Sequence, residues 1–258
     1  MNTLPKITKQ QNNILNYLYK FYFLNTNQLQ KLLNHKNPQK IQKWLKDLKD
    51  KNYINKYDFK ENKFKERSEP STYYLTKLAR LKLKDNDKYD LGILNKVYRV
   101  RSLTSGFVTN CLFLADIYIN LLSQMKKGEK LHFSTVANLQ GFDYLPKPLP
   151  DAYIAIKTSK KTSRSFLILL GAKISWKILD QRMINYVQYS YANRWADYSN
   201  DPLPTFLIIC PNETTKRHLY KTIENESPST PFYLTTKETI QESGFKGDVW
   251  QKVDAEKE

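Results

Sequence analysis

Residues 25–51, NTNQLQKLLNHKNPQKIQKWLKDLKDK, decide how the first part of this chain folds. Thr26 is a good N-cap, and the leucines after it recur at helical spacing. After a short polar break, Asn37 can cap a further helix, and Pro38 suits its first position. We expect that helix to run to about Lys51. Its apolar face carries Ile41, Trp44, Leu45 and Leu48.

The opposite face of the helix over 38–51 is polar and basic. It carries Gln39, Lys40, Gln42, Lys43, Lys46 and Lys49. Upstream, residues 6–22 show the spacing of an amphipathic helix. Downstream, residues 52–59 and 71–76 alternate as strands around a charged tip at 60–70.

Three short helices followed by a hairpin is the order of a winged helix-turn-helix. In this interpretation the helix over 38–51 is the recognition helix, and the hairpin tip is the wing. The wing cations are Lys60, Lys63, Lys65 and Arg67.

The net charge is concentrated in this first part. The chain has 258 residues, and its 42 Lys or Arg against 25 Asp or Glu give a net charge of +17. Residues 1–100 hold 22 basic and 9 acidic side chains, a net of +13, which leaves +4 for residues 101–258. Such concentration favours a polyanionic partner, with nucleic acid ahead of an anionic membrane surface or an acidic protein. Compositional drift in a sequence rich in Lys, Asn, Ile and Tyr is the alternative.

The second half alternates helices and strands. After a long helix at 101–125 we expect strands at 151–156, 165–170, 205–210 and 232–234, and helices at 175–193, 213–225 and 236–243. This pattern indicates an α/β domain. The predicted organisation is a winged helix at 1–84, a connector at 85–100, an α/β domain at 101–253 and a tail at 254–258.

Several classes of protein are disfavoured. The two cysteines form no CxxC pair, which argues against a disulfide framework or a cysteine zinc site. We find no run of 18 apolar residues and no secretory signal, so we expect a cytoplasmic protein without a membrane partner. The phosphate-binding, nucleophile-elbow and zincin motifs are absent from the sequence, and we expect no cofactor.

One arrangement suggests metal chemistry. Asp151 opens a strand after Pro150, and the next strand leads into Gly171-Ala172-Lys173. In the restriction-endonuclease-like fold, an Asp at one strand and a Glu-x-Lys on the next hold Mg²⁺, which activates water. Here Lys173 fills the lysine position, but Gly171 replaces the Glu. Asp116 on the preceding helix is a candidate second metal ligand; otherwise Asp151 caps a strand and Lys173 is an ordinary surface or DNA-facing cation.

Several short motifs occur in order along the chain: Tyr73-Tyr74-Leu75-Thr76, Pro150-Asp151-Ala152, Asn185-Tyr186, 232–236, Gly244-Phe245 and Trp250. Together they resemble the replication-relaxation family of plasmids and related mobile elements. The resemblance implies an N-terminal winged helix joined to a restriction-endonuclease-like (PD-(D/E)xK-type) domain. The chain departs from the family pattern at Leu78-Ala79, where a Gly is usual, and at Gly171, where an acidic residue is usual.

The preferred hypothesis is a double-stranded DNA-binding accessory protein of a plasmid, phage or integrated element. It would act in replication, DNA relaxation or transcriptional control, without nuclease activity. Gln39, Gln42 and Lys43 would reach base edges, while Lys46, Lys49 and the wing cations would hold phosphates. A homodimer and replication or mobilisation proteins are further partners to consider.

Two alternatives come from other functional classes. The first is a Mg²⁺-dependent DNA nickase or nuclease that uses Asp151 and Lys173. The second is a winged-helix module that binds an acidic protein.

Overall fold

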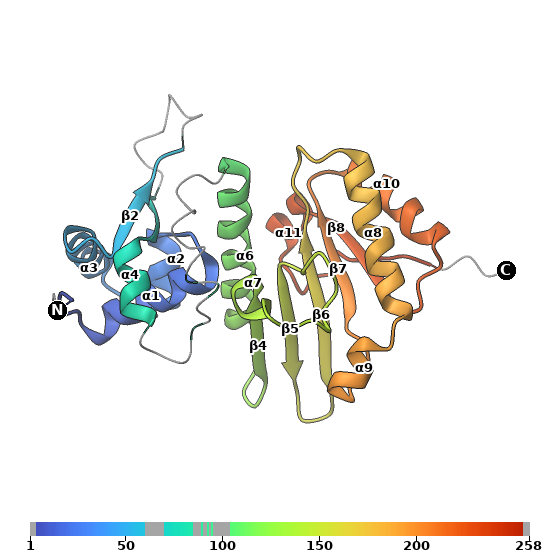
Figure 1. Ribbon diagram of the computed structural model, residues 1–258, viewed down its shortest axis with the longest axis horizontal. Helices are drawn as coiled ribbons and strands as arrows, with labels where there is room; N and C mark the ends of the chain where they lie inside the picture. The colour runs from blue at the N-terminus through green and yellow to red at the C-terminus, as the bar shows by residue number, and fades with distance from the viewer. Residues whose placement is uncertain are drawn as a thin grey trace. The chain divides into compact units, whose positions relative to one another are not determined.

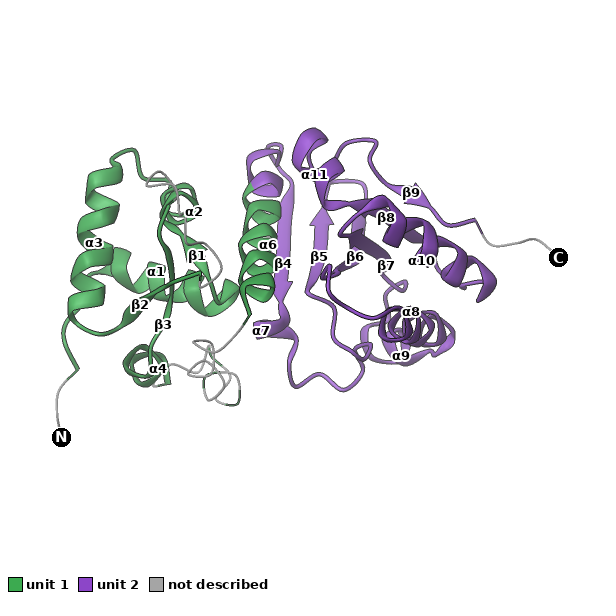
Figure 2. Ribbon diagram, turned by 90° about the horizontal axis from the view of Figure 1, so that it is seen from above, with its two compact units in different colours: residues 1–119 green, residues 120–258 purple. Residues whose placement is uncertain are grey.

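The computed structural model describes residues 4–59, 70–84, 89, 92, 94 and 104–254. The chain forms two compact units, Met1–Ile119 and Asn120–Glu258 (Figure 2). Helices and strands are mixed in both units (Figure 1). The predicted wing cations Lys60, Lys63, Lys65 and Arg67 lie outside the described residues, as does most of the predicted connector 85–100. The predicted domain boundaries therefore stay a prediction.

The first unit joins helices to a small sheet. Its elements are α1 (Lys9–Phe21), β1 (Leu24–Asn25), α2 (Thr26–Leu32), α3 (Pro38–Asp50), β2 (Ile54–Tyr57), β3 (Thr72–Leu75), α4 (Lys77–Lys84) and most of α6 (Ser105–Ser123). The sheet has the order β1-β3-β2, with both pairings antiparallel. Fully buried side chains from the helices build the core, among them Ile14, Leu18, Leu29, Ile41 and Leu48.

Local capping explains where these helices begin. Asn37 accepts hydrogen bonds from the amides of Gln39 and Lys40, and Pro38 opens α3, as predicted. The predicted cap of α2 was wrong by one residue. Asn25, not Thr26, accepts from the Gln28 amide, and the Gln28 side chain returns a bond to the Asn25 amide. This reciprocal capping box satisfies two backbone donors, which a Thr26 cap alone would not do.

The helix α6 is long and apolar enough to cross a membrane by length and composition alone. The same test is passed by core helices of folded proteins. Val108 and Ala115 are fully buried, and Val108 and Cys111 pack with Phe23 and Tyr74 within the first unit. These contacts are those of a core helix.

The second unit is built on a six-stranded mixed sheet, which matches the predicted α/β pattern at this level. Its elements are β4 (Lys130–Thr135), α7 (Val136–Leu139), β5 (Ala152–Lys157), β6 (Thr162–Leu169), α8 (Trp176–Tyr191), α9 (Arg194–Ser199), β7 (Thr205–Cys210), α10 (Glu213–Asn225), β8 (Phe232–Thr236), α11 (Lys237–Ser243) and β9 (Gln251–Lys252). The strand order is β4-β5-β6-β7-β8-β9, parallel from β6 to β8 and antiparallel elsewhere. The strand β4 was not expected from the sequence; only Phe133 and Thr135 of its six residues are buried.

One face of this sheet holds the main core. Phe166 and Ile168 from β6 pack with Phe206 from β7 and with Met183 and Tyr186 from α8, all fully buried. The Phe206 and Phe232 rings stack with centroids 4.5 Å apart. Parallel strands β6, β7 and β8 end at the same edge of the sheet, and β5 begins there, which brings Asp151 to that edge.

Candidate nucleic-acid interface

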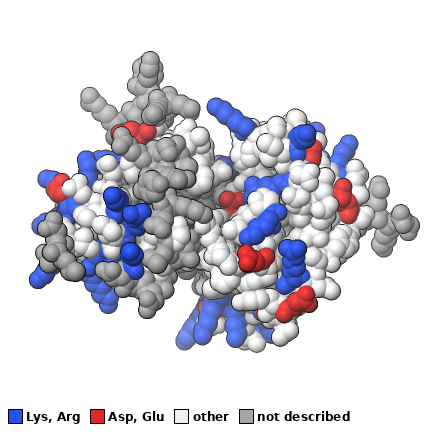
Figure 3. Space-filling model, in the orientation of Figure 1, with Lys and Arg blue, Asp and Glu red and all other residues white. Residues whose placement is uncertain are grey.

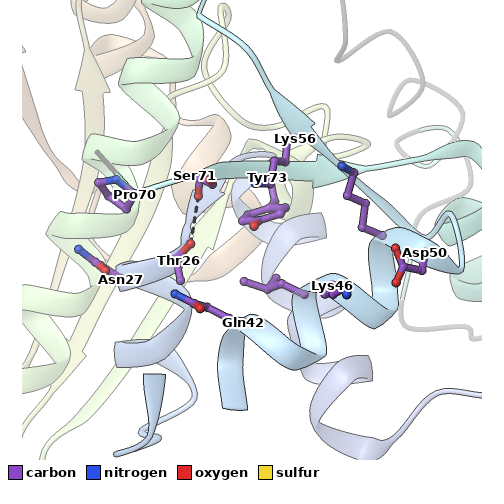
Figure 4. A pocket seen from close by; sticks show the side chains of 11 residues that line it. Thr26, Asn27, Gln42, Lys46, Asp50, Lys56, Pro70, Ser71 and Tyr73 are labelled. Atoms are coloured by element: carbon purple, nitrogen blue, oxygen red, sulfur yellow. Dashed lines mark hydrogen bonds between the residues drawn. The ribbon is translucent and has the colours of Figure 1, made fainter. Parts of the chain in front are cut away.

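A groove of about 690 Å³ lies in the first unit between two helices and the small sheet. Its walls come from the start of α2, the polar face of α3 and strands β2 and β3 (Figure 4). The lining residues are Thr26, Asn27, Gln42, Leu45, Lys46, Lys49, Asp50, Lys56, Pro70, Ser71 and Tyr73.

Two hydrogen bonds tie α2 to the strand that follows the predicted wing. Both the backbone amide and the side-chain hydroxyl of Thr26 donate to the Ser71 carbonyl, at 3.1 and 3.3 Å (Figure 4). The start of α2 is therefore fixed against the sheet, and α3 follows it after a short turn. This anchoring sets the position of one wall of the groove relative to the other.

The polar face of α3 divides between two sides. Gln42, Lys46 and Lys49 are spaced by four and three residues, so they share one stripe and line the groove. Lys40 and Lys43 instead line a second hollow of about 470 Å³, together with Thr8, Gln11 and Lys51 among others.

Gln39 is exposed and lines neither hollow. The structure therefore brings three of the six predicted helix residues together in the groove and separates Lys40 and Lys43 from them.

The groove carries excess positive charge. Lys46, Lys49 and Lys56 line it against one carboxylate, Asp50. Within the described part of the chain, neither Lys46 nor Lys49 forms an ion pair, whereas Lys51 on the other side of α3 contacts Asp47 at 2.7 Å. Hydrogen bonds from Lys51 and Gln11 lower the pKa of Asp47, so that carboxylate is engaged away from the groove.

Tyr73 provides an aromatic surface at the base of the groove. The ammonium of Lys56 lies 5.8 Å from its ring centroid. Burial raises the pKa of Tyr73, although nearby Ser71, Thr26 and Lys49 act in the opposite direction. The phenol therefore stays neutral at physiological pH and keeps its proton for donation. Lys56, Tyr73 and Asn27 were not predicted as site residues, because only the fold brings the two strands and the start of α2 beside α3.

The candidate metal residue Asp151 lies at the start of β5, where it forms hydrogen bonds and an ion pair within the protein. Its amide donates to the Leu167 carbonyl at 2.8 Å, and its Oδ2 accepts from the Leu169 amide at 2.8 Å. The Arg182 guanidinium of α8 lies 3.5 Å from the same oxygen and donates to the Tyr186 hydroxyl at 3.0 Å. Burial raises the pKa of Asp151, and this effect outweighs Arg182.

Two cations other than Lys173 interact with Asp151, namely Arg182 and Lys237. Lys173 is exposed in the turn that follows β6. Lys237, the first residue of α11, is close enough for Asp151 to raise its pKa, although burial lowers that pKa overall. Arg182 and Lys237 lie 31 and 86 positions from Asp151 in the sequence, and no local pattern could have paired them with it.

The third candidate, Asp116, belongs to the first unit. Its carboxylate accepts from the Gln28 side chain at 2.8 Å, and the same amide nitrogen donates to the Leu112 carbonyl at 2.8 Å. Burial raises the pKa of Asp116. Across the described residues, no group of three His, Cys, Asp or Glu side chains is suited to hold a metal ion. Asp151, with Arg182 and Lys237 as neighbours, does not fit a Mg²⁺ centre.

The chain thus combines two mixed helix-and-strand units with a basic groove in the first. Residues 15–201, more than half of the chain, match the family model described as replication-relaxation. The chain therefore belongs to the replication-relaxation family, which confirms the resemblance found in the sequence motifs. The family description indicates a role connected with DNA.

Among curated proteins no match was found. Among solved structures, the restriction endonuclease FokI is similar at 14% identity and a TM-score of 0.35, over 91% of this chain and 43% of the FokI chain. FokI bound to DNA gives 13% identity and the same TM-score, over 91% of this chain and 44% of that chain. This chain spans less than half of FokI, and such a low TM-score does not show a shared fold.

Proposed function

We propose that this protein binds double-stranded DNA through the groove of its first unit. The observation that carries the proposal is the gathering of Gln42, Lys46 and Lys49 on α3 beside Lys56 from the sheet. The element order α1-β1-α2-α3-β2-β3 supports a winged helix-turn-helix, in which α3 would be the recognition helix. The family assignment supports a DNA partner ahead of an acidic protein.

Each groove residue has a role that follows from its chemistry. The Gln42 amide can pair with an adenine edge in the major groove. Lys46 and Lys49 would hold phosphates, which positions the protein without reading sequence. Gln39 and Lys43 would extend the contact along α3, and the predicted wing at 60–70 would add phosphate contacts. The process served would be replication, DNA relaxation or transcriptional control of a plasmid, phage or integrated element.

The second unit would act as a restriction-endonuclease-like platform that does not cut. Its Asp151 is paired with Arg182 and lies near Lys237, an arrangement that suits a structural ion pair. The cytoplasm is the compartment that fits this role. A second copy of the chain, or replication and mobilisation proteins, would be its protein partners.

The test is a salt titration of the intact chain with a labelled duplex. If about six phosphates are contacted, log K should fall with log salt at a slope near −5. The Lys46→Gln/Lys49→Gln variant should lower the size of that slope by about 1.8, because two contacts are lost.

Lys82→Gln/Lys84→Gln is the matched control. It removes the same charge from exposed lysines of α4 in the same unit. A flat salt response of the wild type, or an equal loss in the control, would count against the proposal. Lys40→Gln/Lys43→Gln tests the other side of α3. It should weaken DNA binding less than Lys46→Gln/Lys49→Gln does, because Lys40 and Lys43 lie outside the groove.

A further inference from the structure

A second basic surface lies at one end of the sheet in the second unit. It comprises Lys126, Lys127, Lys130, Lys157, Lys160 and Lys161, which we call the sheet-end patch. Figure 3 shows Lys and Arg side chains gathered below β4 and β5, at the lower end of this unit. All six lysines are exposed, and the segments 126–130 and 157–161 contain one acidic residue, Glu129.

The register of β4 and β5 places two positively charged lysines directly opposite each other. Lys130 and Lys157 are direct partners in the antiparallel pair of β4 and β5, so their side chains share one face at close range. Like charges directly opposite each other destabilise a sheet. In the described part of the chain no carboxylate pairs with any of the six lysines, whereas Arg164 further along β6 is neutralised by Asp201 at 2.7 Å.

The turns that carry the other lysines have defined backbones. In the β5–β6 hairpin, the Thr158 hydroxyl accepts from the amides of Lys160 and Lys161 at 3.2 and 3.1 Å. Before β4, the Glu129 carboxylate accepts from the Lys126 amide at 3.0 Å, so this acid is bound by backbone. The lysine side chains project from fixed turns and are not themselves used in these bonds.

We infer that the sheet-end patch contacts the phosphate backbone of double-stranded DNA, as a second surface besides the groove of the first unit. This inference rests on the DNA partner named in the proposed function, and it does not depend on the groove. The uniform lysine composition suits phosphates, because the lysine ammonium binds phosphate as a point charge and such contacts do not depend on base sequence. Duplex DNA carries one charge per about 1.7 Å of its axis, which gives a dense target for six clustered cations. An edge strand protected by Lys130 alone would not need lysines at 157, 160 and 161.

The test compares charge-matched variants of the full chain on a labelled duplex of arbitrary sequence. Lys160→Gln/Lys161→Gln should lower the size of the log–log salt slope by about 1.8, because two phosphate contacts are lost. The ratio of wild-type to variant affinity should therefore be up to about 60-fold larger at 0.1 M salt than at 1 M salt. The control Lys221→Gln/Lys252→Gln removes exposed lysines from α10 and from β9 at the opposite edge of the sheet. It should leave the slope unchanged. Equal slopes for the wild type and the hairpin variant, or equal losses in hairpin and control variants, would overturn the inference.

A second variant separates binding from folding. Lys157→Glu converts the cross-strand pair with Lys130 into an attractive one, so the melting temperature should stay equal or rise while DNA affinity falls. A fall in both would indicate a structural role and overturn the inference.

Further arms distinguish this inference from the proposed function. If Lys46→Gln/Lys49→Gln weakens binding and the hairpin variant does not, the groove stands and the patch fails. If the reverse holds, the patch stands and the groove fails. Displacement of the duplex by polyglutamate at lower charge concentration than by unlabelled DNA would show an acidic-protein site and overturn the DNA assignment.

Discussion

Replacing Asp151 by alanine should destabilise the second unit, because this carboxylate accepts a backbone hydrogen bond at the end of strand β6. The backbone amide of Leu169 lies beyond the last residue that pairs with β5, and Asp151 Oδ2 accepts its hydrogen bond at 2.8 Å. Leu169 is only 3% exposed. Alanine would leave this buried amide without its acceptor and the Arg182 guanidinium without its counter-charge.

The cost can be worked from these contacts. A buried amide that loses its acceptor costs about 1–3 kcal/mol. The ion pair with Arg182 has side chains 31% and 18% exposed and a 3.5 Å separation, so its loss adds about 1 kcal/mol or less. We expect Asp151→Ala to lower the free energy of unfolding by about 2–4 kcal/mol. Asp151→Asn keeps an oxygen acceptor for Leu169 and should cost about 1 kcal/mol.

Urea unfolding followed by tryptophan fluorescence measures the difference, since Trp195 is buried in the core of this unit. If Asp151→Ala unfolds at the wild-type midpoint, or if the Asn and Ala variants are equally destabilised, the reasoning is wrong. The Asn variant is also the sounder test of the nickase alternative. It removes the charge that Mg²⁺ would need while largely preserving the fold.

The pH dependence of the same pair has a defined sign. Burial raises the folded-state pKa of Asp151 above its usual 3.8. At a pH between the unfolded-state pKa and the raised folded-state pKa, the folded chain holds more protons than the unfolded chain. The free energy of unfolding therefore falls as pH rises through that window. The stability of the wild type relative to Asp151→Asn should therefore decrease over the same window. A relative stability that increases with pH would contradict the assigned direction.

Two further predictions concern buried side chains. Gln28→Ala should lower the stability of the first unit by about 2 kcal/mol. The change removes half of the α2 capping box and the hydrogen bonds to the Leu112 carbonyl and to Asp116. Urea unfolding measures the effect, and an unchanged midpoint would contradict the prediction. Burial raises the pKa of Cys210 to about 12. At pH 8 its thiol should therefore react with a disulfide reagent only as fast as the protein unfolds. Reaction at the rate of a free thiol would contradict this packing.

Local chemistry explains where the sequence analysis succeeded. Asn37 and Pro38 specify the start of α3 within a single turn, and the apolar spacing of Ile41, Leu45 and Leu48 specifies its buried face. Short motifs were likewise sufficient for the family assignment. The strand β4 escaped detection because only two of its six residues are buried, whereas the central strands β6 and β7 carry the continuous apolar runs that are typical of strands inside a sheet.

The candidate sites show the limit of that local information. The sequence determined that α3 presents glutamines and lysines on its polar face, because helical periodicity alone sorts that face from the core. Tertiary structure decided which of them lie beside Lys56 in one groove, and that Asp151 forms an ion pair with Arg182. It also placed Lys130 opposite Lys157. The physical reason is that these neighbours are joined by strand register and helix packing, which depend on contacts between residues far apart in the chain.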